Sequence, residues 1–167
     1  FNFGVTKISA ADKQKNTVVL TQKKWATINN NSDGTDTTDP VKLHQRDFQS
    51  LRVQDGRLNT TDWTVSAEAT PFTNGKKSLI GASINIAKAT EYTSDPKGKV
   101  AAKSKFKIEA DGATVTTDIL KADPEARFMS DLKWDTDKVT LEFPGSVIDT
   151  GNYSSTITWT LSGTPDV

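Results

Sequence analysis

The chain offers few residues with the chemistry that catalysis needs. Histidine occurs once, as His44 in the polar segment VKLHQRDF. A Ser-His-Asp triad requires a serine, a histidine and an acid to meet in space, and the sequence contains no G-x-S-x-G turn to present the serine. We therefore interpret His44 as a surface or edge residue. The 21 acidic residues suit the turns of a polar β protein, and no two of them stand out as a glycosidase pair. We expect no enzymatic activity.

The loop NNNSDGTDTTDP, residues 29–40, has the start of a calcium-binding pattern. Oxygen ligands alternate at Asn29, Asn31 and Asp33, and Gly34 follows them. This matches the first half of the calcium loop D-x-[DN]-x-[DN]-G, but Pro40 stands where the bidentate glutamate belongs. We expect a solvated Asn/Asp loop, with no metal and no cofactor. Calcium binding through a different set of loop oxygens stays open.

Lysines cluster at positions 23–24 and 76–77, and a longer series at 97, 99, 103, 105 and 107 includes residues on both sides of Phe106. Lysines on an exposed edge strand prevent unwanted pairing with other chains, so a solvated edge is our first interpretation. The alternative is that these cations contact an anionic polymer.

Two tryptophan segments show the clearest pattern. In YSSTITWTLSG, residues 153–163, Trp159 and Leu161 share one face and hydroxyl residues line the other. In TDWTVSAEAT, Trp63 and Val65 share a face in the same way. Large apolar side chains on one face of a strand are typical of a sandwich core, so we expect both pairs to be at least partly buried. A binding platform or an interface anchor is the alternative, and periodicity does not separate the two.

Alternation with a period of two also runs through the segments that surround these tryptophans. It groups Val139 with Leu141 and Phe143, Ile80 with Ala82, Ile84 and Ile86, and Phe106 with Ile108 and Ala110. Turn signals such as QDGR, TNGKK, DPKGK and DTGN separate the runs. The sequence therefore predicts an all-β fold, an antiparallel β-sandwich. Residues 121–129 could add one short helical turn, because Asp123 can cap it and Pro124 suits its first position. Residues 97–107 remain ambiguous between helix and strand.

Length and composition narrow the function further. The 167 residues suit a single domain, 1–167, with a lean core, since the hydrophobic share is 34%. The net charge is zero, which argues against a general nucleic-acid or anionic-membrane binder. The absence of cysteine excludes disulfides, thiolate zinc sites and cysteine nucleophiles. The sequence contains no run of eighteen apolar residues, so it predicts no membrane-spanning helix.

Four segments follow one another in an order that one family shares. They are FNFGVTKISA (1–10), LRVQDGRLNTTDWTVSAEATPFT (51–73), KSLIGASINI (77–86) and KVTLEFPGSVIDTGNYSSTITWTLSGTP (138–165). In this order they resemble the WxL domain, a cell-surface domain of Gram-positive bacteria, over nearly the whole chain. The first motif here reads Trp63-Thr64-Val65, with valine where the family usually has leucine. Valine keeps a branched apolar side chain on the same face, so the packing should survive.

The resemblance implies a non-catalytic, secreted module that attaches non-covalently to the cell wall, with peptidoglycan as the ligand. It also implies a partner, a WxL-interacting surface protein. The motif positions that it assigns to binding are Trp63, Val65, Trp159 and Leu161. The chain begins at FNFG, and we expect that a signal peptide was removed. A glycan-binding module and a protein-docking module both remain open.

Overall fold

The computed structural model describes residues 1, 3, 15–19, 48–56, 62–145 and 151–163. These residues form antiparallel strands and one 3-10 turn, Thr136–Lys138. The strands are β1 (Lys15–Val19), β2 (Phe48–Asp55), β3 (Trp63–Ala69), β4 (Ser83–Ile86), β5 (Ala89–Thr93), β6 (Val100–Ala102), β7 (Phe106–Glu109), β8 (Thr116–Ala122), β9 (Phe128–Asp135), β10 (Val139–Pro144) and β11 (Ile157–Gly163). The predicted all-β class is confirmed.

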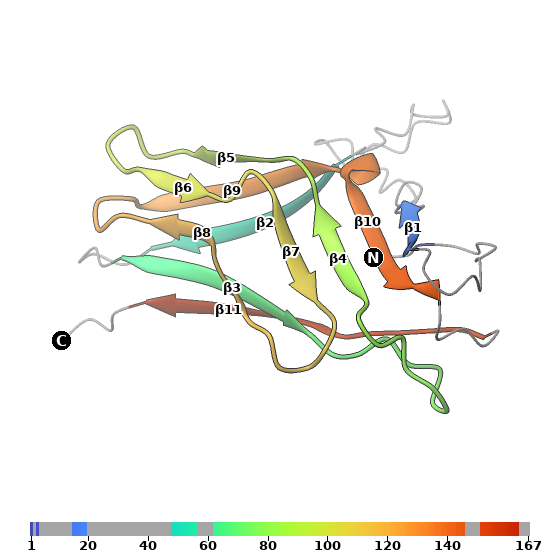
Figure 1. The fold of residues 1–167 in the computed structure, drawn as a ribbon. Coiled ribbons are helices and arrows are strands. Elements are labelled where there is room, and N and C mark those ends of the chain that lie inside the picture. Colours follow the sequence, from blue (N-terminus) through green and yellow to red (C-terminus); the bar gives the residue numbers. More distant parts are fainter. Residues whose placement is uncertain (2, 4–14, 20–47, 57–61, 146–150, 164–167) are drawn as a thin grey trace, which may run out of the picture.

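The strands form three antiparallel sheets, in the orders β1-β10-β4-β7, β11-β3-β8-β6 and β2-β9-β5. We call the second of these the motif sheet, because it contains both tryptophan segments. In Figure 1 the strands of the motif sheet run nearly horizontally, while β4, β7 and β10 cross at a steep angle. The arrangement confirms the predicted antiparallel β-sandwich.

The core lies between these sheets, and alternating residues supply it. Trp63, Val65, Ala67 and Ala69 of β3 are buried, and so are the predicted groups on β7 and β10. A strand presents successive side chains to opposite faces, so a half-buried strand needs apolar residues only at every second position. The alternation seen in the sequence therefore marks the inner faces of these strands.

The predicted grouping of Ile80 with Ala82, Ile84 and Ile86 is wrong at its first member. Ile80 is 72% exposed, whereas the other three are buried. The chain is still turning at Ile80, because Gly81 adopts a left-handed conformation with φ of 76° and β4 begins only at Ser83. The period-two rule therefore does not yet apply at Ile80.

The helical turn expected at residues 121–129 is also absent. Strand β8 continues through Ala122, and the carboxylate of Asp123 then accepts backbone hydrogen bonds from Lys99 and Glu125 at 3.1 and 3.2 Å. These bonds stabilise a tight turn into β9. The one 3-10 turn in the described residues lies further along, at Thr136–Lys138.

The ambiguous stretch 97–107 forms β6 and the beginning of β7. Each of these strands ends the order of its sheet. All five lysines of this region are exposed, which agrees with their interpretation as residues of solvated edges. Contact with an anionic polymer stays a prediction.

Two further candidates, the loop 29–40 and His44, lie outside the described residues. Within the part of the chain that the structure covers, no three His, Asp or Glu residues are grouped as metal ligands would be. The same residues include no helix of the length and apolarity that crossing a membrane requires.

Candidate functional site

The first tryptophan motif lies in the interior of the motif sheet. Strand β3 is hydrogen-bonded on both sides, to β11 and to β8. Trp63 is 5% exposed and Val65 is 2% exposed, so neither side chain presents a surface to a ligand. The indole N–H of Trp63 is buried and has no hydrogen-bond partner. Both residues were assigned to binding by resemblance, and their burial favours a role in supporting the sheet.

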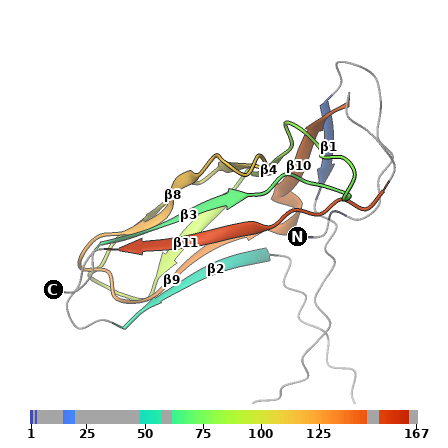
Figure 2. The same ribbon diagram turned by 90° about the horizontal axis from the view of Figure 1, so that it is seen from below.

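The second motif lies on β11, which is the last strand of the same sheet. Trp159 is partly buried, as expected, and its ring stacks on Trp134 of β9 with 6.4 Å between centroids and 23° between planes. Leu161 is 58% exposed, so the expectation of burial is wrong at this residue. Leu161 is exposed because β11 is the last strand of its sheet. Among the described residues, no further strand extends the inner face beyond β11. Figure 1 shows β11 on the side of β3 away from β8, and in the view of Figure 2 β11 is drawn between β3 and β2.

An aromatic cluster holds Trp159 in place. Its partner Trp134 is buried and also meets the ring of Phe106 edge to face, with 6.2 Å between centroids. Phe1 packs against Trp134 in a similar way at 6.5 Å. Edge-to-face and stacked pairs add about 0.5–1.5 kcal/mol each beyond the area that they bury. Trp159 is therefore a rigid group with part of its surface accessible.

The other face of β11 carries hydroxyl groups. Thr158, Thr160 and Ser162 are exposed, and the adjacent residues Thr64 and Ser66 of β3 are partly exposed. We call these five residues the hydroxyl face. None of them is charged, and they lie on two paired strands with a continuous register. Charged residues border this face, since Glu68 lies across from Thr158 and Lys121 lies across from Thr64. The hydroxyl residues themselves shed water at less cost than charged residues would.

A second accessible surface lies on the outer face of the β2-β9-β5 sheet. Arg52 of β2 donates two hydrogen bonds to Asp131 of β9, from Nε to Oδ1 at 2.7 Å and from Nη2 to Oδ2 at 2.9 Å. The side chain of Asp131 is only 1% exposed, whereas that of Arg52 is 57% exposed. Hydrogen bonds from Arg52 hold the pKa of the Asp131 carboxyl below its ordinary value. Both groups therefore stay charged at neutral pH.

Tyr92 of β5 completes this surface. It lies opposite Asp131 in the register, and its side chain is 51% exposed. Lys133 places its Nζ 5.8 Å from the centroid of the Tyr92 ring and 3.9 Å from a carboxylate oxygen of Asp131. We call Arg52, Tyr92, Asp131 and Lys133 the tyrosine surface. The exposed ring can stack on a sugar, while the cations of Lys133 and Arg52 can pair with an acidic group.

Sequence reasoning missed the tyrosine surface. Arg52 and Asp131 are 79 positions apart, and they meet only because β2 and β9 pair in one particular register. No local motif connects the four residues. An exposed aromatic residue on a strand that also carries polar residues, as in ATEYT, was the one signal available.

Comparison with known proteins decides which family this fold represents. A family model described as "WxL domain surface cell wall-binding" matches residues 1–165. The chain belongs to the WxL domain family. The resemblance carried by the two tryptophan motifs is confirmed, and the family description is that of a surface domain that binds the cell wall. No curated protein and no solved structure gives a significant match to this chain.

The two motifs of this WxL domain therefore differ in their surroundings. Val65, which replaces the usual leucine, fits in the core opposite Leu120 of β8, so the packing survives as expected. Of the four motif positions, only Leu161 and part of Trp159 are accessible from solvent.

Proposed function

We propose that this WxL domain is a non-catalytic module that attaches a secreted protein non-covalently to the Gram-positive cell wall, with peptidoglycan as its ligand. We also infer that residues 1–167 act as one domain. The family description supports wall binding. The observation that carries the choice of ligand is the tyrosine surface, where the half-exposed ring of Tyr92 lies beside the cation of Lys133 and Arg52 lies on the far side of β9.

The chemistry of this surface suits peptidoglycan on two counts. The glycan offers apolar sugar faces, which stack on aromatic rings. Its stem peptides offer carboxylates, which pair with Arg52 and Lys133. Because Asp131 already holds the guanidinium in a fixed position, the binding of an acid costs little further ordering of that side chain.

Binding to protein-free sacculi tests this proposal. We expect Tyr92→Ala to weaken retention at least about tenfold, the loss typical of residues that dominate an interface. Ile80→Ala is the matched control, since Ile80 is also exposed but lies in a turn away from the β2-β9-β5 sheet. The part of binding due to Lys133 should fade as salt rises. Retention of Tyr92→Ala equal to wild type would refute a role for this surface.

A second candidate function is docking to a WxL-interacting surface protein, so that the wall is reached through that partner. The hydroxyl face supports it, because its five residues carry no charge and extend over two paired strands. We expect Thr160→Lys to abolish capture by the partner's extracellular part, because it places a charge across from the uncharged Ser66, where the docked state has no water. The same variant should leave binding to sacculi unchanged. Loss of sacculus binding as well would show that the two functions use one surface.

A further inference from the structure

Among the residues that the structure describes, no strand pairs with one backbone edge of β11. The register identifies the residues whose backbone groups lie along that edge. The N–H of Thr70 donates to the carbonyl of Thr156 at 2.9 Å, and the same register continues along β11 from Ile157 opposite Ala69. In an antiparallel pair, hydrogen-bonded residues alternate with residues whose backbone groups point away. The backbone groups of Thr158, Thr160 and Ser162 are therefore the ones that form hydrogen bonds with β3. Ile157, Trp159, Leu161 and Gly163 point their N–H and C=O groups outward, where no described strand meets them.

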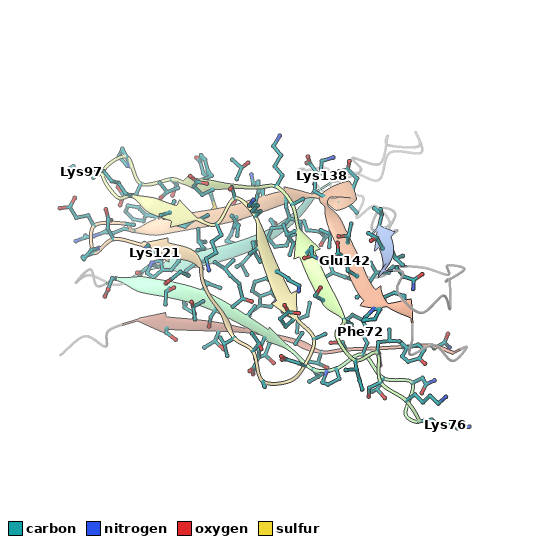
Figure 3. The ribbon with its side chains drawn as sticks, in the orientation of Figure 1. Phe72, Lys76, Lys97, Lys121, Lys138 and Glu142 are labelled. Carbon is teal, nitrogen blue, oxygen red and sulfur yellow. The ribbon has the colours of Figure 1, made fainter. Side chains whose placement is uncertain are left out.

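This edge lacks the usual protection against pairing. No residue from Gly151 to Gly163 is charged. Each of the other described strands at the edge of a sheet has a charged residue within it or directly beside it: Lys15 in β1, Arg52 in β2, Glu91 in β5, Lys99 and Lys103 beside β6, and Lys107 in β7. In Figure 3 the labelled lysines, Lys76, Lys97, Lys121 and Lys138, all lie away from β11. Charged edges repel added strands, so β11 is the edge most open to one.

The residues of β11 are complementary to a second copy of themselves. An antiparallel pair with its two-fold axis at Thr160 uses all seven residues of the strand, Ile157–Gly163. It brings the outward backbone groups of Ile157 opposite those of Gly163, and the groups of Trp159 opposite those of Leu161. No like charges meet in this pairing. We propose that two copies of this WxL domain associate through β11, which joins their motif sheets into one continuous sheet.

Two features of the monomer support this occupant. In the paired state the exposed Leu161 of each copy lies across from Trp159 of the other, on the inner face where both are accessible. Aromatic and aliphatic cross-strand neighbours stabilise antiparallel pairs. The hydroxyl faces of the two copies also adjoin one another, since Thr160 sits at the axis. The interface is isologous, which is the commonest symmetry of homo-oligomers.

The oligomeric state of the full chain tests the proposal. Sedimentation over a wide concentration range should show the mass doubling from 18.2 kDa as concentration rises. Leu161→Pro should abolish this association, because it removes an outward N–H while the bonds to β3 remain. Leu161→Val is the matched control and should still associate, since it keeps both the N–H and an apolar side chain. Wild-type protein that stays monomeric throughout would overturn the proposal.

Cysteine crosslinking provides a second test that does not depend on a proline variant folding. The chain has no cysteine, so a single introduced thiol can pair only between copies. In the proposed register, the two copies of residue 160 form a non-hydrogen-bonded pair about 4.5 Å apart at Cα, within the range of a disulfide. Thr160→Cys should therefore crosslink on mild oxidation. In Thr158→Cys the thiols are about four residues, roughly 13 Å, out of register, and this control should stay monomeric.

The outcomes separate the possible occupants of the edge. Preferential crosslinking of Thr160→Cys over Thr158→Cys supports self-pairing at this register. Equal crosslinking of the two variants would overturn it. A monomeric wild type whose capture of a partner protein is lost in Leu161→Pro would also overturn it, and would assign the edge to a strand from that partner.

Discussion

Trp159 and Leu161 belong to one motif and share one face of one strand, but the structure predicts very different costs for truncating them. Trp159 is partly buried and stacks on Trp134, whereas Leu161 is 58% exposed. Replacement of each by alanine, Trp159→Ala and Leu161→Ala, therefore compares a ring within the core with a side chain at its margin.

The expected magnitudes follow from the burial of each side chain. A tryptophan can bury about 150–250 Å², of which the partly covered Trp159 ring loses on the order of 100–150 Å². At about 25 cal/mol per Å², that area corresponds to about 2.5–4 kcal/mol. The lost stacking on Trp134 adds about 0.5–1.5 kcal/mol, and relaxation at the sheet edge offsets part of it. We expect Trp159→Ala to lower the free energy of unfolding by about 3 kcal/mol, within the usual range for large aromatic residues.

Leu161→Ala should cost much less. Full burial of a leucine contributes about 1.5–3 kcal/mol, and less than half of Leu161 is covered, since it is 58% exposed. We expect a loss of about 1 kcal/mol, which is well below the loss expected for Trp159→Ala. The measurement is urea unfolding followed by far-UV circular dichroism at a concentration where the protein is monomeric. Equal losses for the two variants, or a larger loss for Leu161→Ala, would refute the assignment of β11 to the sheet edge.

Three further predictions test other parts of the structure. Gly98→Ala should lower the free energy of unfolding by about 1–3 kcal/mol or more, because an added Cβ would lie 2.1 Å from Cα of Ala126; Gly56→Ala, with no atom within 4 Å, is the control in urea unfolding. The pKa of Asp111 is lowered to about 2, chiefly by the hydroxyl of Thr114, so its contribution to stability should persist above its unfolded pKa and be lost as the pH falls through 2. Carboxyl NMR titration should show that pKa rising toward its ordinary value in Thr114→Val. Ile80→Thr should leave the unfolding midpoint in urea nearly unchanged, because Ile80 is largely exposed.

The sequence predicted the inner faces of the strands well, and its failures have a physical cause. The groups on β3, β7 and β10 are buried as expected, because alternation is a local property that each strand carries with it. The error at Ile80 arose where a left-handed glycine, Gly81, delays the strand. The helical turn predicted from Asp123 was also wrong. Asp123 is a residue able to cap a helix, but here its carboxylate accepts backbone hydrogen bonds in a turn.

The candidate binding surfaces were much less accessible to prediction. Resemblance to the family directed attention to the tryptophan motifs, but it assigned the same role to Trp63 and Trp159. Their surroundings differ because β3 lies inside the motif sheet and β11 lies at its edge. The tyrosine surface required the pairing of β2, β9 and β5, which brings Arg52 beside Asp131 across 79 positions.

By itself, the sequence determined the fold class, the family and the faces of β3, β4, β7 and β10 that turn toward the core. All three depend on local alternation or on the order of motifs along the chain. Only the tertiary structure decided the order of strands within each sheet. That order results from backbone hydrogen bonds between distant segments. The periodicity of side chains along one strand carries no information about which other strand it pairs with. It is also what places Leu161 in solvent and leaves the outward backbone groups of Trp159 and Leu161 at the edge where we propose that a second copy binds.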